Sequence, residues 1–247
     1  MLKFADMENF FVGDRSFCED LECPDETPNY RLSVPVYGVK ASFDRKWGFD
    51  EPLVISGDVE LEILDRSGRS IGGYDLWNVE IILASPDGCA GEFRATASWL
   101  PRVSAKPVWE LWRVAPPGKV NQWWDIPIGQ REGWVEVAQN SRISTRLIGE
   151  EILLDGRGVV DLASFFCAIG EAVHGPGGYF GSNFMALSDC LRRLPRKECS
   201  PMRVRWLDYA VAEEHLSKSI DTDEGSVRYV DLIVEVFSDA GISVVFE

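Results

Sequence analysis

The stretch YFGSNFMALSDCL, residues 179–191, predicts an aromatic-rich loop that runs into a short helix. Gly181 gives the backbone the freedom that a tight loop needs, and Ser182 is a residue type that favours the N-cap position. Phe184, Leu187 and Leu191 follow at positions i, i+3 and i+7, a spacing that places them on one apolar face. The sequence therefore predicts a helix that packs this face against a core.

The opposite face of the predicted helix carries an acid. Met185, Asp189 and Arg193 are spaced four residues apart, so they share one outward face. Asp189 then has two interpretations: an exposed pair with Arg193, which contributes about 0.2–0.5 kcal/mol, or a contact with another molecule.

The chain on both sides of this helix alternates between strand and helix patterns. Asp161 is a suitable N-cap for a helix whose apolar side includes Phe165 and Phe166. Strands separated by helices imply a parallel sheet with right-handed crossovers. The predicted strands are 151–154, 202–206 and 243–246, and the further helices begin near Leu162 and cover 210–218 and 227–240.

Residues 147–247 resemble the barstar family, small intracellular inhibitors that block a ribonuclease by plugging its active site. The resemblance rests on the order and spacing of several motifs, LLDG at 153–156 and PMRVRW at 201–206 among them. The central motif consists of Tyr179, Phe180, Gly181, Asn183, Ala186, Leu187, Asp189, Cys190 and Leu191. The resemblance implies a three-stranded parallel sheet with about four helices.

The resemblance also implies which residues contact a partner. In the family, an acid on the second helix and an acid on the last helix meet the nuclease, and here these are Asp189 and Asp239. Inhibitor carboxylates can occupy the positions where basic nuclease side chains hold phosphate, through charge-assisted hydrogen bonds. The resulting set of partner-binding residues is Tyr179, Phe180, Gly181, Asn183, Asp189 and Asp239.

Two features depart from the family pattern, and one acidic helix face has two interpretations. Met185 stands where the family often has another acid, and the segment 192–197 is basic, which a strongly basic cleft would repel. Asp231, Glu235 and Asp239 are spaced four apart and share one helix face, which is either a binding face or a solvated surface.

The first part of the chain shows a different periodicity. Apolar and polar residues alternate between residues 30 and 137, with turn signals between the runs, so we expect antiparallel strands and no helix there. The polar segment 139–149 is the expected boundary. The prediction is an α+β protein with a β-rich domain at 1–146 and a barstar-like α/β domain at 147–247.

Tryptophans cluster just before that boundary. They can fill the core of the β-rich domain, or they can form a platform for a sugar or a hot spot for a protein or peptide. The second interpretation supports an alternative function, in which the first domain is a binding module and the barstar-like domain a scaffold. The cluster consists of Trp109, Trp112, Trp123, Trp124 and Trp134.

Composition narrows the class of partner. The chain of 247 residues has 40 acidic and 25 basic side chains, a formal net charge of −15. Nucleic-acid binding needs a basic patch, so this charge favours a basic protein partner, although it also serves solubility. We expect no membrane span and no signal peptide, and the six scattered cysteines favour a reduced cytoplasmic protein.

No motif predicts catalysis, a metal or a cofactor. The two histidines, His174 and His215, show no metal-ligand spacing, and the glycine run at 175–181 lacks the lysine of a phosphate-binding loop. We therefore expect a protein that binds another protein and is not an enzyme.

Overall fold

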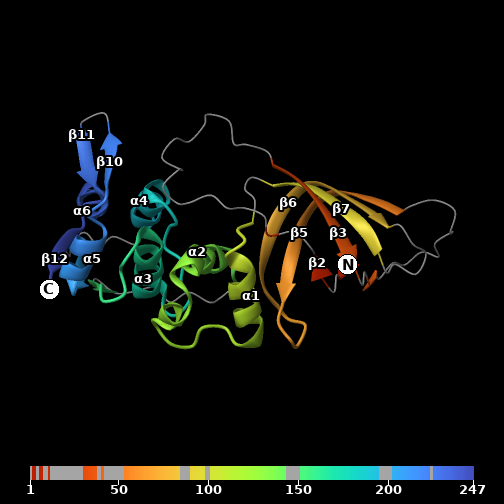
Figure 1. Cartoon of the computed structure of the whole chain (residues 1–247), viewed down its shortest axis with the longest axis horizontal. Helices are drawn as coiled ribbons and strands as arrows, with labels where there is room; N and C mark the ends of the chain where they lie inside the picture. Colours follow the sequence, from red (N-terminus) through yellow and green to blue (C-terminus); the bar gives the residue numbers. More distant parts are fainter. Residues whose placement is uncertain are drawn as a thin grey trace. The chain divides into compact units, whose positions relative to one another are not determined.

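The computed structural model describes residues 2–3, 6–7, 11, 30–37, 40–41, 53–83, 90–97, 101–142, 151–194, 202–222 and 225–247. The contacts divide the chain into two compact units (Figure 1). The N-terminal unit comprises residues 1–15, 21–63 and 73–103, and the C-terminal unit comprises 16–20, 64–72 and 104–247.

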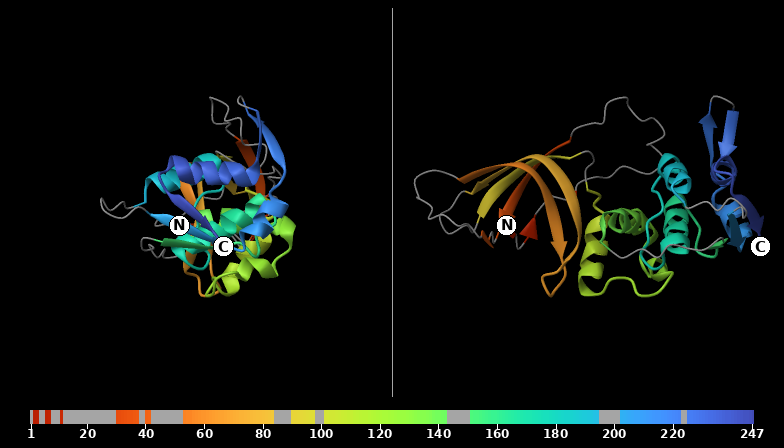
Figure 2. Two further views of the ribbon diagram at one scale, coloured as in Figure 1. Left: turned by 90° about the vertical axis from the view of Figure 1, so that its left-hand side faces the viewer. Right: turned by 180° about the vertical axis from the view of Figure 1, so that it is seen from behind.

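The N-terminal unit contains a five-stranded sheet in the order β2-β3-β7-β6-β5, which is visibly curved (Figure 2). Strand β7 lies between β3 and β6 and is antiparallel to both. The predicted antiparallel strands are confirmed for this unit. The strands are β2 (Asp6–Met7), β3 (Tyr30–Tyr37), β5 (Leu53–Leu64), β6 (Ser70–Leu83) and β7 (Ala90–Ala97), and a separate short pair joins β1 (Leu2–Lys3) to β4 (Lys40–Ala41).

The C-terminal unit contains the predicted three-stranded parallel sheet. Strands β8 (Glu151–Asp155) and β12 (Ser243–Phe246) both pair in parallel with β9 (Arg203–Leu207), in the order β12-β9-β8. Burial alternates along β8, because Ile152 and Leu154 are fully buried whereas Leu153 is half exposed. One face of the sheet therefore forms the core, and the helices supply the other side of that core.

The described part of residues 151–247 contains four helices, as predicted. Helix α3 (Leu162–His174) follows β8, and α4 (Phe184–Arg192) follows a glycine-rich loop of residues 175–183. Helix α5 (Tyr209–His215) follows β9, and α6 (Tyr229–Asp239) precedes β12. Asp161 caps α3 as expected, because its side chain accepts a hydrogen bond from the Ser164 N–H at 2.7 Å.

A hairpin before α6 was not predicted. Strands β10 (Ser219–Thr222) and β11 (Gly225–Arg228) pair in an antiparallel ladder, so α6 begins at Tyr229 and not at Val227. The β-branched side chains of Ile220 and Val227 face each other across this ladder, a pairing that favours strand over helix.

The expectation of no helix between residues 30 and 137 was wrong. Helices α1 (Ala105–Val114) and α2 (Arg131–Asn140) lie in this range, together with the short 3-10 turns η2 (Gln122–Asp125) and η3 (Ile128–Gln130). The buried residues of α1 repeat at helical spacing: Ala105, Val108, Trp109 and Trp112.

The tryptophans of this segment fill a core, and that core belongs to the C-terminal unit. Trp109, Trp112, Trp123 and Trp134 are each at most 2% exposed. The rings of Trp112 on α1 and Trp134 on α2 meet edge to face at 5.1 Å between centroids. Four of the five tryptophans are therefore too deeply buried to form a sugar or peptide platform, whereas Trp124 is half-buried.

The compact C-terminal unit includes residues 104–146, about 40 residues that lie before the boundary expected between 146 and 147. The physical reason is visible on α3, where all residues except Ala172 and His174 are buried. A helix that is buried all round needs cover on more than its sheet side, and α2 packs against it. Whether 147–247 folds alone stays a prediction of the sequence that can be tested.

We expect a fragment of residues 104–247 to unfold cooperatively and a fragment of residues 147–247 to lack fixed tertiary structure. Removing one buried tryptophan side chain typically costs about 3–5 kcal/mol, whereas a whole domain is stable by about 5–15 kcal/mol. Thermal unfolding followed by near-UV circular dichroism checks this, with the full chain as control. Equal melting midpoints for the two fragments would contradict it.

Candidate functional site

The loop between α3 and α4 adopts backbone angles that favour glycine. Gly177 has a φ of 68° and Gly181 a φ of 99°. A Cβ at position 181 would lie 2.8 Å from the backbone nitrogen of Leu187, closer than real contacts allow. The loop therefore returns tightly onto the first turn of α4, and Gly181 has the conformational role expected from the sequence.

The N-cap of α4 is Asn183, one residue after the expected Ser182. The Asn183 carboxamide oxygen accepts a hydrogen bond from the Ala186 N–H at 2.8 Å. Ser182 instead accepts a hydrogen bond from the Tyr179 hydroxyl at 3.3 Å. Asn183 thus fixes the start of the helix, and Ser182 holds the side chain of Tyr179 at the beginning of the motif.

The two aromatic residues of the motif are placed differently. Tyr179 is half-buried, and this burial raises the pKa of its hydroxyl. Phe180 is only 3% exposed, and its ring centroid lies 5.8 Å from that of His174. Phe180 was expected to contact a partner, but its burial leaves almost no surface for that contact, so its side chain holds the loop in place.

Helix α4 separates an apolar face from a charged one. Leu187 and Leu191 are fully buried, whereas the side chain of Asp189 is 63% exposed. Asp189 lies 3.5 Å from Arg192 and not beside the expected Arg193. Both members of this pair are mostly in water, so it contributes only about 0.2–1 kcal/mol and another cation can replace it.

The acidic face expected on α6 is exposed. Asp231, Glu235 and Asp239 are all on the surface, and Asp239 is the last residue of the helix. Asp231 accepts two hydrogen bonds from Arg228, at 2.7 and 2.8 Å, which lower the pKa of its carboxyl. Helices α4 and α6 pack together, and Phe184 stacks on Tyr229 at 6.1 Å.

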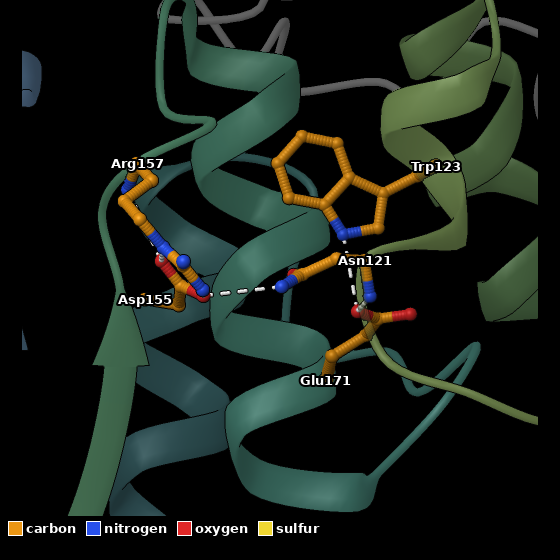
Figure 3. Close-up of polar contacts among 5 residues, drawn as sticks. All are labelled: Asn121, Trp123, Asp155, Arg157 and Glu171. Atoms are coloured by element: carbon orange, nitrogen blue, oxygen red, sulfur yellow. Dashed lines mark hydrogen bonds and ion pairs between the residues drawn. The ribbon is translucent and has the colours of Figure 1, made fainter.

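A buried acid that the sequence analysis missed lies beneath the glycine-rich loop. Glu171 on α3 is 5% exposed. One carboxylate oxygen accepts hydrogen bonds from the Asn121 N–H at 2.6 Å and from the Trp123 indole N–H at 3.1 Å (Figure 3). The other oxygen accepts a bond from the Gly177 N–H at 3.2 Å. Burial raises the pKa of Glu171, and the three N–H donors act against that rise.

Asn121 continues this set of contacts to the end of β8. Its side-chain amide donates to Asp155 at 3.1 Å, and Arg157 binds the same carboxylate at 2.6 and 2.9 Å (Figure 3). The hydrogen bonds from Arg157 are the main cause of a lowered pKa for Asp155. The Arg157 guanidinium also lies over the Trp124 ring, 5.4 Å from its centroid.

One signal of the buried acid was present in the sequence. Glu171 interrupts the otherwise apolar run LASFFCAIGEAV of α3, and an acid in a fully buried helix requires donors. Nothing in the sequence identified those donors, because two of the three are backbone N–H groups, and Asn121 and Trp123 lie about 50 residues away in the sequence.

Within the described part of the chain, no group of three or more His, Cys, Asp or Glu side chains is placed to hold a metal ion. None of the helices described is long and apolar enough to cross a membrane. The exposed position of His215 on α5 agrees with the solvated helix that its acidic neighbours indicated.

We expect Asp155→Asn to destabilise the protein by about 1 kcal/mol at pH 7, a value reduced because Arg157 is partly in water. The pKa of Asp155 is lower in the folded state than its ordinary 3.8, so its stabilisation is present above that pH and is lost as the pH falls through the lowered value. Urea unfolding of both proteins at pH 7 and pH 3 measures this, with Asp221→Asn on β10 as control. A difference in unfolding free energy that stays constant between the two pH values would contradict the prediction.

The comparison with protein families finds one match. Residues 150–240 match the family model described as Barstar (barnase inhibitor). No curated protein and no solved structure matches the chain. The match covers β8, the glycine-rich loop, α4, β9, α5 and α6, so it contains the exposed Asp189 and the loop that precedes it. Residues 150–240 of this chain therefore form a Barstar family domain.

Proposed function

We propose that this protein is a non-catalytic inhibitor of a ribonuclease, and that its Barstar domain binds the nuclease active site through α4 and the loop before it. The observation that carries the proposal is Asp189, an exposed and weakly paired carboxylate on the helix that follows the glycine-rich loop of a Barstar domain. The proposal extends to the partner: a toxin ribonuclease neutralised by its immunity protein in the cytoplasm.

The chemistry of a ribonuclease active site supports this use of Asp189. Such a site holds the phosphate of RNA with basic side chains, and a carboxylate in the phosphate position forms charge-assisted hydrogen bonds with them. Leaving Arg192 costs Asp189 little, because that pair is long and solvent-exposed. A formal net charge of −15 also speeds the encounter with a basic nuclease.

Some of the other site residues contact the partner in this proposal, and the rest support the loop that carries them. Tyr179 and Asn183 are half-buried at the surface of the loop, where part of each side chain is open to a partner. Gly181 and the buried Phe180 give the loop its shape. Asp239 adds a second exposed carboxylate from the neighbouring helix α6.

We expect Asp189→Ala to weaken binding to the nuclease roughly tenfold to hundredfold, because a hydrogen bond to a charged group contributes about 1.5–3 kcal/mol. Titration calorimetry and inhibition of RNA cleavage measure it, with barnase and the nucleases encoded by neighbouring genes as partners. Glu110→Ala is the matched control, since Glu110 is also exposed and pairs with an arginine three residues away at 3.1 Å.

Three results would count against the proposal. They are the absence of binding to every nuclease of the panel, equal inhibition by the wild type and Asp189→Ala, and an equal loss of affinity in Glu110→Ala.

A further inference from the structure

Glu171 receives hydrogen bonds from two separate parts of the chain, and each of its oxygens serves one of them. Oε2 accepts from Asn121 and Trp123, which belong to the segment between α1 and α2. Oε1 accepts from Gly177 in the loop that leads to α4. Because the carboxylate is planar and rigid, the position of one set of donors constrains the position of the other.

The segment on the Oε2 side is itself firmly held. The Trp123 side chain is fully buried, and the Arg131 guanidinium lies over its ring, 5.1 Å from the centroid. Asn121 has a φ of 66° and binds Asp155 through its side chain. These contacts fix where the two donors point, so the segment can orient Glu171 (Figure 3).

The loop on the Oε1 side is short and closely packed. Gly177 lies two residues before Tyr179 and four before Gly181. A Cβ at Gly178 would lie 2.5 Å from the carbonyl oxygen of Gly170 on α3, so the loop backbone has little room to move by itself. Gly177, which donates to Glu171, is thus connected by a short and closely packed backbone to the residues proposed to contact the nuclease.

We propose that Glu171 is a positioning residue for partner binding, through which the segment 104–142 sets the conformation of the loop 175–183. This segment lies before the matched family range of 150–240, so the proposal assigns part of the support of the binding loop to residues outside that range. The inference rests on the proposed function for its effect on affinity, but its effect on the loop can be measured without a partner.

The test uses the full-length chain with Glu171→Gln and Trp123→Phe. A glutamine can satisfy the donors on one side only and presents an N–H group to the other, and phenylalanine removes the indole donor. Trp134→Phe is the matched control for lost volume, because Trp134 is equally buried and its indole N–H has no hydrogen-bond partner among the described residues. Glu214→Gln on α5 controls for the lost charge.

The first measurement is hydrogen–deuterium exchange of the amides in residues 175–183, without a nuclease. We expect exchange at Gly177 to become roughly tenfold to hundredfold faster in Glu171→Gln, the effect of losing a charge-assisted hydrogen bond. We expect it to become faster also in Trp123→Phe, because the carboxylate that binds Gly177 then loses one of the donors that orient it. The two control variants should keep the wild-type rate there. Equal exchange in all variants would overturn the proposal, and faster exchange in Glu171→Gln alone would overturn the part assigned to the segment.

The second measurement is the affinity for a nuclease that the wild type binds, with barnase as the first probe. We expect a roughly tenfold loss in Glu171→Gln and Trp123→Phe at temperatures well below their melting midpoints, and no loss in the controls. Unchanged affinity despite faster loop exchange would overturn the positioning role. If the wild type binds no nuclease, the proposed function fails while the exchange experiment still decides the coupling. If Glu171→Gln does not fold, the two tryptophan variants decide it.

Discussion

The carboxylate of Glu171 joins two segments of the C-terminal unit through its hydrogen bonds. An ionised acid in a protein interior is expensive unless donors surround it, and here three N–H groups do so. Because these donors come from two segments on either side of α3, burying this one group requires both segments to be in place together. The hydrogen bonds of this buried acid thus connect the segment between α1 and α2 to the loop that leads to α4.

The unit uses acids in two opposite ways. Glu171 has its oxygens occupied by fixed donors and has almost no exposed surface, so it can orient the chain but cannot reach another molecule. The carboxylate of Asp189 is mostly exposed and pairs with Arg192 at 3.5 Å, so it can exchange this guanidinium for a cation that binds it more strongly. Under the proposed function, burial and hydrogen-bond occupancy separate Glu171, which would support the binding surface, from Asp189, which would belong to it.

The segment 104–142 packs against the Barstar domain of this chain, although it lies before the matched residues. The matched range begins at residue 150, yet α3 inside that range is covered by α2, which lies before it. Trp112 and Trp134, which the sequence placed in a β-rich domain, pack α1 against α2 in the core of the C-terminal unit. The residues that match the family, 150–240, therefore form only part of the compact C-terminal unit, which includes residues 104–247.

The sequence by itself determined the features that depend on local periodicity. The spacing of apolar residues was sufficient for the three parallel strands and four helices after residue 150, and for the outward face of Asp189. Local chemistry also identified Asp161 as a cap and Gly181 as the residue needed in the loop. Composition misled in α1, where aromatic and β-branched residues, which are typical of strands, stand at helical spacing and pack on α2.

Only the tertiary structure decided the contacts between distant residues. The donors of Glu171 lie on both sides of it in the sequence, and two of them are backbone N–H groups that every non-proline residue carries. No residue pattern indicates which backbone N–H group will point at a buried acid. The packing of the segments determines which N–H groups bind Glu171, because the free energy of the buried charge depends on all its donors together.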